Sequence, residues 1–135
     1  MKNSRFAVAI HILSIASTQS GATSDFIAAS VNTNPVVIRR INSLLKKAGI
    51  LKSQAGIPGI YLTREPSEIT LLDIYKAVQG KDETTFSIHE DPNPQCVVGN
   101  NIQATLEDSF MRAQKAMENE LANQTLDDIV GDLFV

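Results

Sequence analysis

Residues 34–49 read NPVVIRRINSLLKKAG, and this stretch decides the predicted fold. Asn34 suits the cap of a helix, Pro35 suits its first position because its missing N–H costs nothing there, and Gly49 suits its end. We therefore predict a helix over residues 35–48. Its inward face would carry Val37, Ile38, Ile41, Leu44, Leu45 and Ala48. Its outer face would be basic and would carry Val36, Arg39, Arg40, Ser43, Lys46 and Lys47.

The segments before this helix complete a helix-turn-helix pattern. Apolar residues at helical spacing predict a first helix over residues 4–18. A short second helix is predicted over residues 25–31, with Thr23 or Ser24 as its cap. The polar residues 31–34 then form a tight turn into the basic helix. Two short helices joined in this way are typical of a DNA-binding helix-turn-helix.

The segment after the basic helix has the pattern of a β-hairpin. We predict short strands at residues 50–53 and 60–63, separated by a turn at residues 54–59 that is rich in Gly and Pro. A hairpin directly after a helix-turn-helix is a wing. The predicted fold class is therefore mainly α with a small β-hairpin, a winged helix-turn-helix followed by a long C-terminal helix.

Charge is strongly segregated along the chain, although the net charge is only −3. Residues 1–64 carry eight basic side chains and one acidic side chain, and residues 65–135 carry four basic and fourteen acidic ones. A basic half suggests a polyanion as partner, while an acidic half stays away from phosphates. No apolar run is long enough to cross a bilayer, and a single cysteine fits a reducing cytoplasm, where we expect the protein.

The second half of the chain predicts a short helix, a loop and a long helix. Thr70 and Asp73 form a capping-box pattern for a helix over residues 71–79. Residues 81–98 are polar and hold two prolines, so we expect a long loop there, of a kind that is often functional. We therefore divide the chain into a DNA-binding domain (1–80), a loop with a sensory role (81–98), and a dimerisation helix with a docking tail (99–135).

The long helix, expected from about Asn100 to Asn123, has an apolar stripe. The stripe consists of Ile102, Leu106, Phe110, Ala113, Met117 and Leu121. Because such a helix has few local partners, we expect it to meet its twin across a two-fold axis, the alternative being packing on its own domain. Thr125 can cap a last helix, whose apolar end at residues 133–135 should also dock.

Several of these motifs together resemble the Rrf2 family of bacterial transcription regulators over nearly the whole chain. The resembling segments are residues 4–7, 27–28, 44–53, 59 with 62–64, 68–74 and 78–80. The run from the wing to Gly80 is the specific part, since winged helices in general do not share it. The resemblance implies a homodimer with the long C-terminal helix as its dimer element.

The chain departs from the family pattern at two places. The family's wing commonly carries Arg-Gly followed by Gly-Gly, but here Ala55-Gly56 and Pro58-Gly59 occupy those places, so contact with DNA would fall to Lys52 or to backbone amides. Many members hold an iron–sulfur cluster on three cysteines of the loop, where this chain has Cys96 alone. We therefore expect the cluster-free branch of the family and no cofactor.

Cys96 is the candidate redox-sensing residue. It lies just before the long helix, whose N-terminus would favour a thiolate, although Glu90 and Asp91 would oppose it. The alternative is a small packed residue without a sensing role. A metal site that combines Cys96 with His89 is a weaker alternative.

These observations predict a homodimeric DNA-binding transcriptional regulator, a repressor, and not an enzyme, because the chain shows no phosphate loop, nucleophile motif or paired acid and base. The alternative is a winged-helix module that binds protein. The predicted partners are double-stranded operator DNA and a second copy of the chain, with no membrane. The predicted DNA-binding residues are Lys2, Arg5, Asn32, Thr33, Asn34, Pro35, Val36, Arg39, Arg40, Ser43, Lys47 and Lys52. Two-fold symmetry implies a palindromic operator with half-sites about 10 bp apart, or a multiple of that distance.

Overall fold

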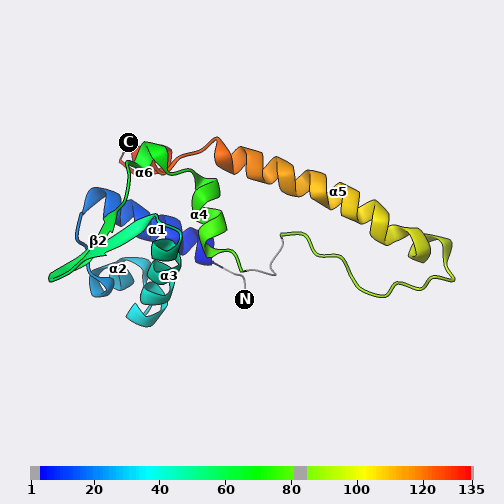
Figure 1. Cartoon of the computed structure of the whole chain (residues 1–135), viewed down its shortest axis with the longest axis horizontal. Coiled ribbons are helices and arrows are strands. Elements are labelled where there is room, and N and C mark those ends of the chain that lie inside the picture. Colours follow the sequence, from blue (N-terminus) through cyan, green and yellow to red (C-terminus); the bar gives the residue numbers. More distant parts are fainter. Residues whose placement is uncertain (1–3, 81–84, 135) are drawn as a thin grey trace. The chain divides into compact units, whose positions relative to one another are not determined.

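The computed structural model describes residues 4–80 and 85–134. They form two compact units: one holds the residues up to Gln79 and those from Leu121 onward, and the other is Gly80–Glu120. The elements, shown in Figure 1, are α1 (Arg5–Thr18), α2 (Ser24–Val31), α3 (Pro35–Lys47), β1 (Leu51–Gln54), β2 (Ile57–Leu62), the 3-10 turn η1 (Pro66–Glu68), α4 (Leu71–Val78), α5 (Val97–Ala122) and α6 (Leu126–Leu133). This architecture confirms the predicted fold class.

The helix-turn-helix forms with the expected caps. The Thr23 hydroxyl accepts a hydrogen bond from the backbone N–H of Phe26, and the side-chain oxygen of Asn34 accepts one from Val37 at 3.1 Å. Between the two helices Asn32 adopts a left-handed conformation, with φ of 66°, which asparagine tolerates better than most residues. The turn therefore reverses the chain within a few residues and sets α3 against α2.

The hairpin has a tighter turn than the sequence predicted. Gln54 pairs with Ile57, so the turn is Ala55-Gly56 rather than residues 54–59, and β2 begins three residues earlier than expected. Gly56 supplies the positive φ that such a two-residue turn requires. Pro58 therefore lies within β2, which a two-stranded sheet allows because its strands have a free edge.

The hairpin is also joined to the start of α2. The N–H of Gly21 donates to the carbonyl of Ile60 at 3.0 Å, and the N–H of Ile60 donates to Ala22 at 3.1 Å. Gly59 makes this approach possible, because a Cβ there would collide with the backbone carbonyl of Gly21. The wing and the helix-turn-helix are thus held together by backbone contacts.

The C-terminal segment returns to complete the first unit. The N–H of Leu126 donates to Ile69, and the N–H of Leu71 donates to Gln124 at 2.9 Å. Leu126 is fully buried, whereas Leu133 and Phe134 are 60% and 72% exposed in the single chain. Val135 lies outside the described residues, so the docking of the last apolar residues stays a prediction. The largest fully buried side chains of this unit are Ile12, Leu13, Ile27, Ile38, Leu45, Ile50, Ile69, Ile74 and Leu126.

A capping box stabilises α4, as the sequence predicted. The Thr70 hydroxyl accepts from the backbone N–H of Asp73, whose carboxylate accepts from the backbone of Thr70 and from Arg64 at 3.0 Å. Burial raises the pKa of Asp73, but the hydrogen bonds from Thr70 and the charge of Arg64 outweigh it, so this pKa lies below its usual value. The ionised carboxylate is therefore the form that stabilises this corner.

The second unit contains most of α5 and the residues before it, some of which pack along that helix. The ring of Phe86 lies 5.6 Å from the ring of Phe110, centroid to centroid. The Thr85 hydroxyl donates to the sulfur of Met117. The helix begins at Val97, three residues before the predicted start, and none of its residues is buried in the single chain.

Candidate nucleic-acid interface

The outer face of α3 is exposed and basic, as predicted. Arg39, Arg40, Ser43, Lys46 and Lys47 are all exposed. The α3 sequence includes no acidic residue, and the Ser43 hydroxyl donates to the backbone of Arg39 at 3.0 Å. The helix therefore presents cations and one small polar side chain on a single face, which is the composition that contacts phosphates and base edges.

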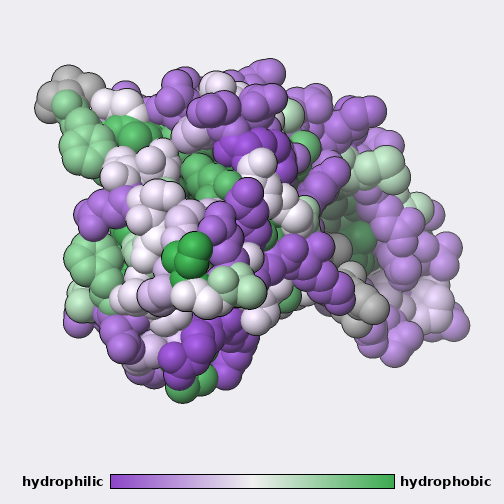
Figure 2. All heavy atoms as spheres, turned by 60° about the vertical axis from the view of Figure 1, so that its left-hand side comes forward, coloured by the Kyte–Doolittle hydropathy of each residue, from purple (hydrophilic) through white to green (hydrophobic). Residues whose placement is uncertain are grey.

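An apolar side chain stands at the start of that face. Val36 is the second residue of α3 and is 56% exposed. Pro35 precedes it and is half-buried. An apolar side chain on a reading helix can contact the methyl group of thymine. Figure 2 shows the surface from the hairpin side, where hydrophilic side chains predominate and apolar ones lie between them.

The residues before α3 have mixed environments. Asn32 and Asn34 are exposed, and Thr33 is half-buried with its backbone N–H on Ala28. The Asn34 oxygen is occupied in the cap, so its amide N–H₂ group is what remains for DNA. Arg5 begins α1 and is half-buried, and Lys2 lies outside the described residues.

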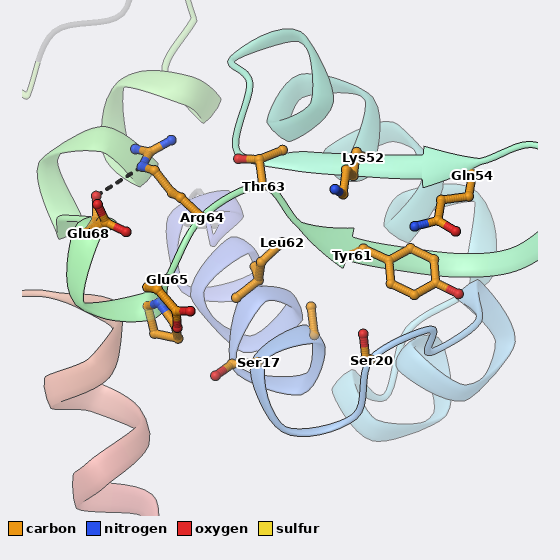
Figure 3. A pocket seen from close by; sticks show the side chains of 12 residues that line it. Ser17, Ser20, Lys52, Gln54, Tyr61, Leu62, Thr63, Arg64, Glu65 and Glu68 are labelled. Carbon is orange, nitrogen blue, oxygen red and sulfur yellow. Dashed lines mark hydrogen bonds between the residues drawn. The ribbon is translucent and has the colours of Figure 1, made fainter.

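Lys52 lies apart from the α3 cations. Figure 3 shows Lys52 and Gln54 of β1 beside Tyr61 of β2, in a cavity of about 600 Å³ over the end of α1. Its neighbour Ser53 lines a different cavity together with Arg39 and Lys46. Successive strand residues point to opposite faces, so the hairpin separates Lys52 from α3. Arg64 and Glu68 also line the first cavity, which therefore contains both signs of charge.

The inward face of α3 differs from the sequence prediction at two positions. Ala48 is exposed rather than inward, because the helix ends at Lys47. Asn42, which the sequence interpretation left unassigned, is only 4% exposed, and its side-chain oxygen has no hydrogen-bond partner among the described residues. The spacing could have located it, since Asn42 is four residues after Ile38 and three before Leu45, both fully buried.

The apolar stripe of α5 is present, and part of it is already covered by its own chain. All six stripe residues are half-buried in the single chain. Phe110 packs on Phe86, and Leu121 packs against the core of the first unit. Val97, Val98 and Met111 on the same helix are far more exposed, from 65% to 79%.

Cys96 lies immediately before α5. It is a free, exposed thiol, and its carbonyl accepts the N–H of Asn100 at 2.8 Å. Among the described residues, no three or more His, Cys, Asp or Glu side chains are grouped as metal ligands would be. Within those same residues, no helix is long and apolar enough to span a membrane.

Comparisons with known proteins agree in pointing to one family. The Rrf2 family, described as iron-dependent transcriptional regulators, matches residues 2–132. YwnA of Bacillus subtilis (strain 168), named as an HTH-type transcriptional regulator, is 56% identical over 134 residues, which cover 99% of this chain and 100% of YwnA. A protein of known crystal structure that is described as DNA-binding is 52% identical, with a TM-score of 0.79 over 93% of this chain and 98% of that one. CymR, the global cysteine regulator of B. subtilis, shares the fold, with a TM-score of 0.70 at 22% identity over 97% of this chain and 96% of CymR.

The iron in that family description does not fit the residues of this chain. A protein-bound iron–sulfur cluster needs several thiolate or imidazole ligands. The chain has one cysteine, Cys96, and the described residues offer no grouped set of metal-binding side chains around it. We therefore derive no step of DNA binding or sensing from iron.

Proposed function

Because this chain belongs to the Rrf2 family of DNA-binding transcriptional regulators, we propose that it acts as a homodimeric repressor that reads a palindromic operator through α3. The exposed basic face of α3 is the observation that carries the proposal. In a helix-turn-helix the second helix lies in the major groove, with its N-terminal residues at the base edges. Such a regulator works beside the chromosome, in the cytoplasm.

We assign the residues of that face to two roles. Val36, Arg39 and Arg40 lie nearest the start of α3 and would meet base edges, with an arginine able to pair bidentately with guanine. Lys47, one turn or more further along, would meet phosphate, as would Asn32 and Thr33 of the turn. The alternative of a protein-docking module fits this face poorly, since the core of a protein-binding surface is depleted in charge.

A second copy of the chain would pair through α5. Its exposed apolar residues are uncovered in one chain and its stripe is covered only in part, since no residue of the helix is buried. Two-fold pairing would set two reading helices about one helical turn of DNA apart, which matches a palindrome.

The proposal is tested by binding of the purified protein to DNA from its own promoter at two salt concentrations. We expect a footprinted site whose affinity falls as salt rises, since released counterions drive binding. Lys76→Ala, which removes an exposed cation of α4, is the control for Arg39→Ala, which removes one from α3. Binding no stronger than to random DNA, or equal losses in both variants, would contradict the proposal.

A further inference from the structure

The tip of the wing carries no charged side chain. Residues 53–63, which lie between Lys52 and Arg64, include no Lys, Arg, His, Asp or Glu. Gln54 and Ile57 pair across the two-residue turn, and both are exposed, Ile57 by 49%. Residues directly opposite each other on two strands lie on the same face of the hairpin. The tip therefore presents an amide and a branched apolar side chain next to each other.

The wing lies beside the basic face of α3 and is held in place. Ser53 of β1 lines a cavity of about 400 Å³ together with Arg39 and Lys46 of α3. Two backbone hydrogen bonds join Ile60 of β2 to the segment before α2. In Figure 1 the hairpin projects from the helices to a free tip. DNA that lies along α3 therefore passes the wing as well.

The groove next to the major groove, which α3 would enter, is the minor groove. An apolar side chain against its phosphate walls would remove water from a charge without replacing the lost hydrogen bonds, which is unfavourable. The floor of the groove consists of base edges instead. Amide side chains such as glutamine and apolar ones such as isoleucine are among those that contact this floor in minor-groove binding proteins. The uncharged tip therefore fits the floor of the minor groove better than the phosphate backbone.

The same two side chains can distinguish base pairs. In the minor groove an A·T pair shows only acceptors, whereas a G·C pair adds the amino group of guanine. The amide N–H₂ group of Gln54 can donate to the acceptors. Ile57 has no atom that accepts a hydrogen bond in its side chain, so a G·C pair beneath it would bury the guanine amino group without a partner. Contact with the tip is therefore more favourable at A·T pairs.

We propose that Gln54 and Ile57 contact the minor groove beside each half-site and select A·T pairs there. This rests on the proposed function, because α3 must lie in the neighbouring major groove for the tip to reach this place. The contact that the sequence alone assigned to Lys52 or to backbone amides is thereby made by two uncharged side chains. The operator has a base preference outside the pairs that α3 touches.

The test uses the full chain and three versions of its footprinted operator, whose flanking pairs are all A·T, all G·C or all inosine·cytosine. An inosine·cytosine pair lacks the guanine amino group, so it resembles A·T in the minor groove and G·C in the major groove. We expect the G·C version to bind about fivefold more weakly or worse, because an amino group is buried without a partner. The inosine version should bind within about twofold of the A·T version. Equal binding of all three, or an inosine version as weak as the G·C version, would overturn the proposal.

Variants of the tip show which side chains produce this preference. Ile57→Ala removes the apolar contact and Gln54→Ala removes the donor, both at exposed positions, so each should reduce the difference in affinity between A·T and G·C flanks. Lys52→Ala is the matched control on the same strand, and it should leave the preference among the three versions unchanged whatever its effect on overall affinity. A preference that survives in both tip variants is read from the shape of the DNA and would overturn the proposal, as would a preference lost only in Lys52→Ala.

Failure of this proposal and failure of the proposed function give different results. An operator that is bound and footprinted without any flank preference refutes the proposal and leaves the function intact. A protein that binds no operator more strongly than random DNA refutes the function, and the proposal with it. Circular dichroism of each variant establishes that it is folded before its affinities are compared.

Discussion

Replacing Asn42 by leucine should make the protein more stable. The Asn42 oxygen is buried without a partner in the part of the chain that the structure describes, which costs about 1–3 kcal/mol of desolvation that leucine does not incur. Leucine also buries apolar surface at a site that is 4% exposed, a gain of up to about 1.5–3 kcal/mol for a full side chain. Because Asn42 also lines the cavity of Arg39 and Lys46, whose wall is polar on its other sides, we expect the lower part of this range, about 1–2 kcal/mol in total.

The measurement is urea unfolding of the full chain at a fixed protein concentration, with Ser43→Ala as control. Ser43 is the exposed neighbour on the same helix, so its replacement should change the free energy of unfolding by less than about 0.5 kcal/mol. The midpoint for Asn42→Leu should rise with an unchanged slope. A fall of 1 kcal/mol or more would refute the reasoning, since it would mean that the Asn42 amide has a partner in the native protein.

Four further perturbations test other parts of the molecule. Arg39→Ala should lose about 1–3 kcal/mol of operator-binding free energy and relax the preference at one base pair. Fluorescence anisotropy on single-base operator variants measures this, and an equal loss of affinity for all variants would refute it. Asp73→Asn should destabilise the chain by less than about 1 kcal/mol at neutral pH, because the carboxylate is 42% exposed. Since the pKa of Asp73 is lowered in the folded state, the stability advantage of the wild type is complete above about pH 4 and disappears as pH falls below it. A difference in unfolding free energy that stays constant in acid would contradict this. Leu106→Glu places a charge on the α5 stripe and should shift sedimentation toward monomer. A sedimentation coefficient equal to that of the wild type would contradict α5 as the dimer interface. Cys96→Ser should abolish any release of operator by a thiol oxidant, and a variant that still responds would exclude the exposed Cys96 as the sensor.

Much of the first unit could be predicted because its signals are local. The cap at Asn34, the proline after it and the capping box at Thr70 each depend on residues within one turn of a helix, and the structure shows all three. Side-chain spacing likewise predicted the exposed cations of α3. These features need no knowledge of what packs against them.

Most of the features that sequence alone missed depend on contacts between distant segments. Gly59 is used for its approach to Gly21 rather than for a turn. The short hairpin turn is the exception, because the pairing of Gln54 with Ile57 that defines it is local. The burial of Asn42 depends on what α3 packs against, because a polar residue at an inward position is usually assigned to the surface. The exposure of Leu133 and Phe134 likewise depends on where α6 ends against the core.

The return of the chain at Leu126 makes the first unit a discontinuous domain. The second unit, Gly80–Glu120, is an insertion in it, and the core residue Leu126 becomes available only after that insertion has been synthesised. A nascent or truncated chain that stops before residue 126 therefore has an incomplete core beneath Ile69 and Leu71. We expect such fragments to unfold more readily than the full chain, so the stability of the N-terminal helices depends on residues translated after α5.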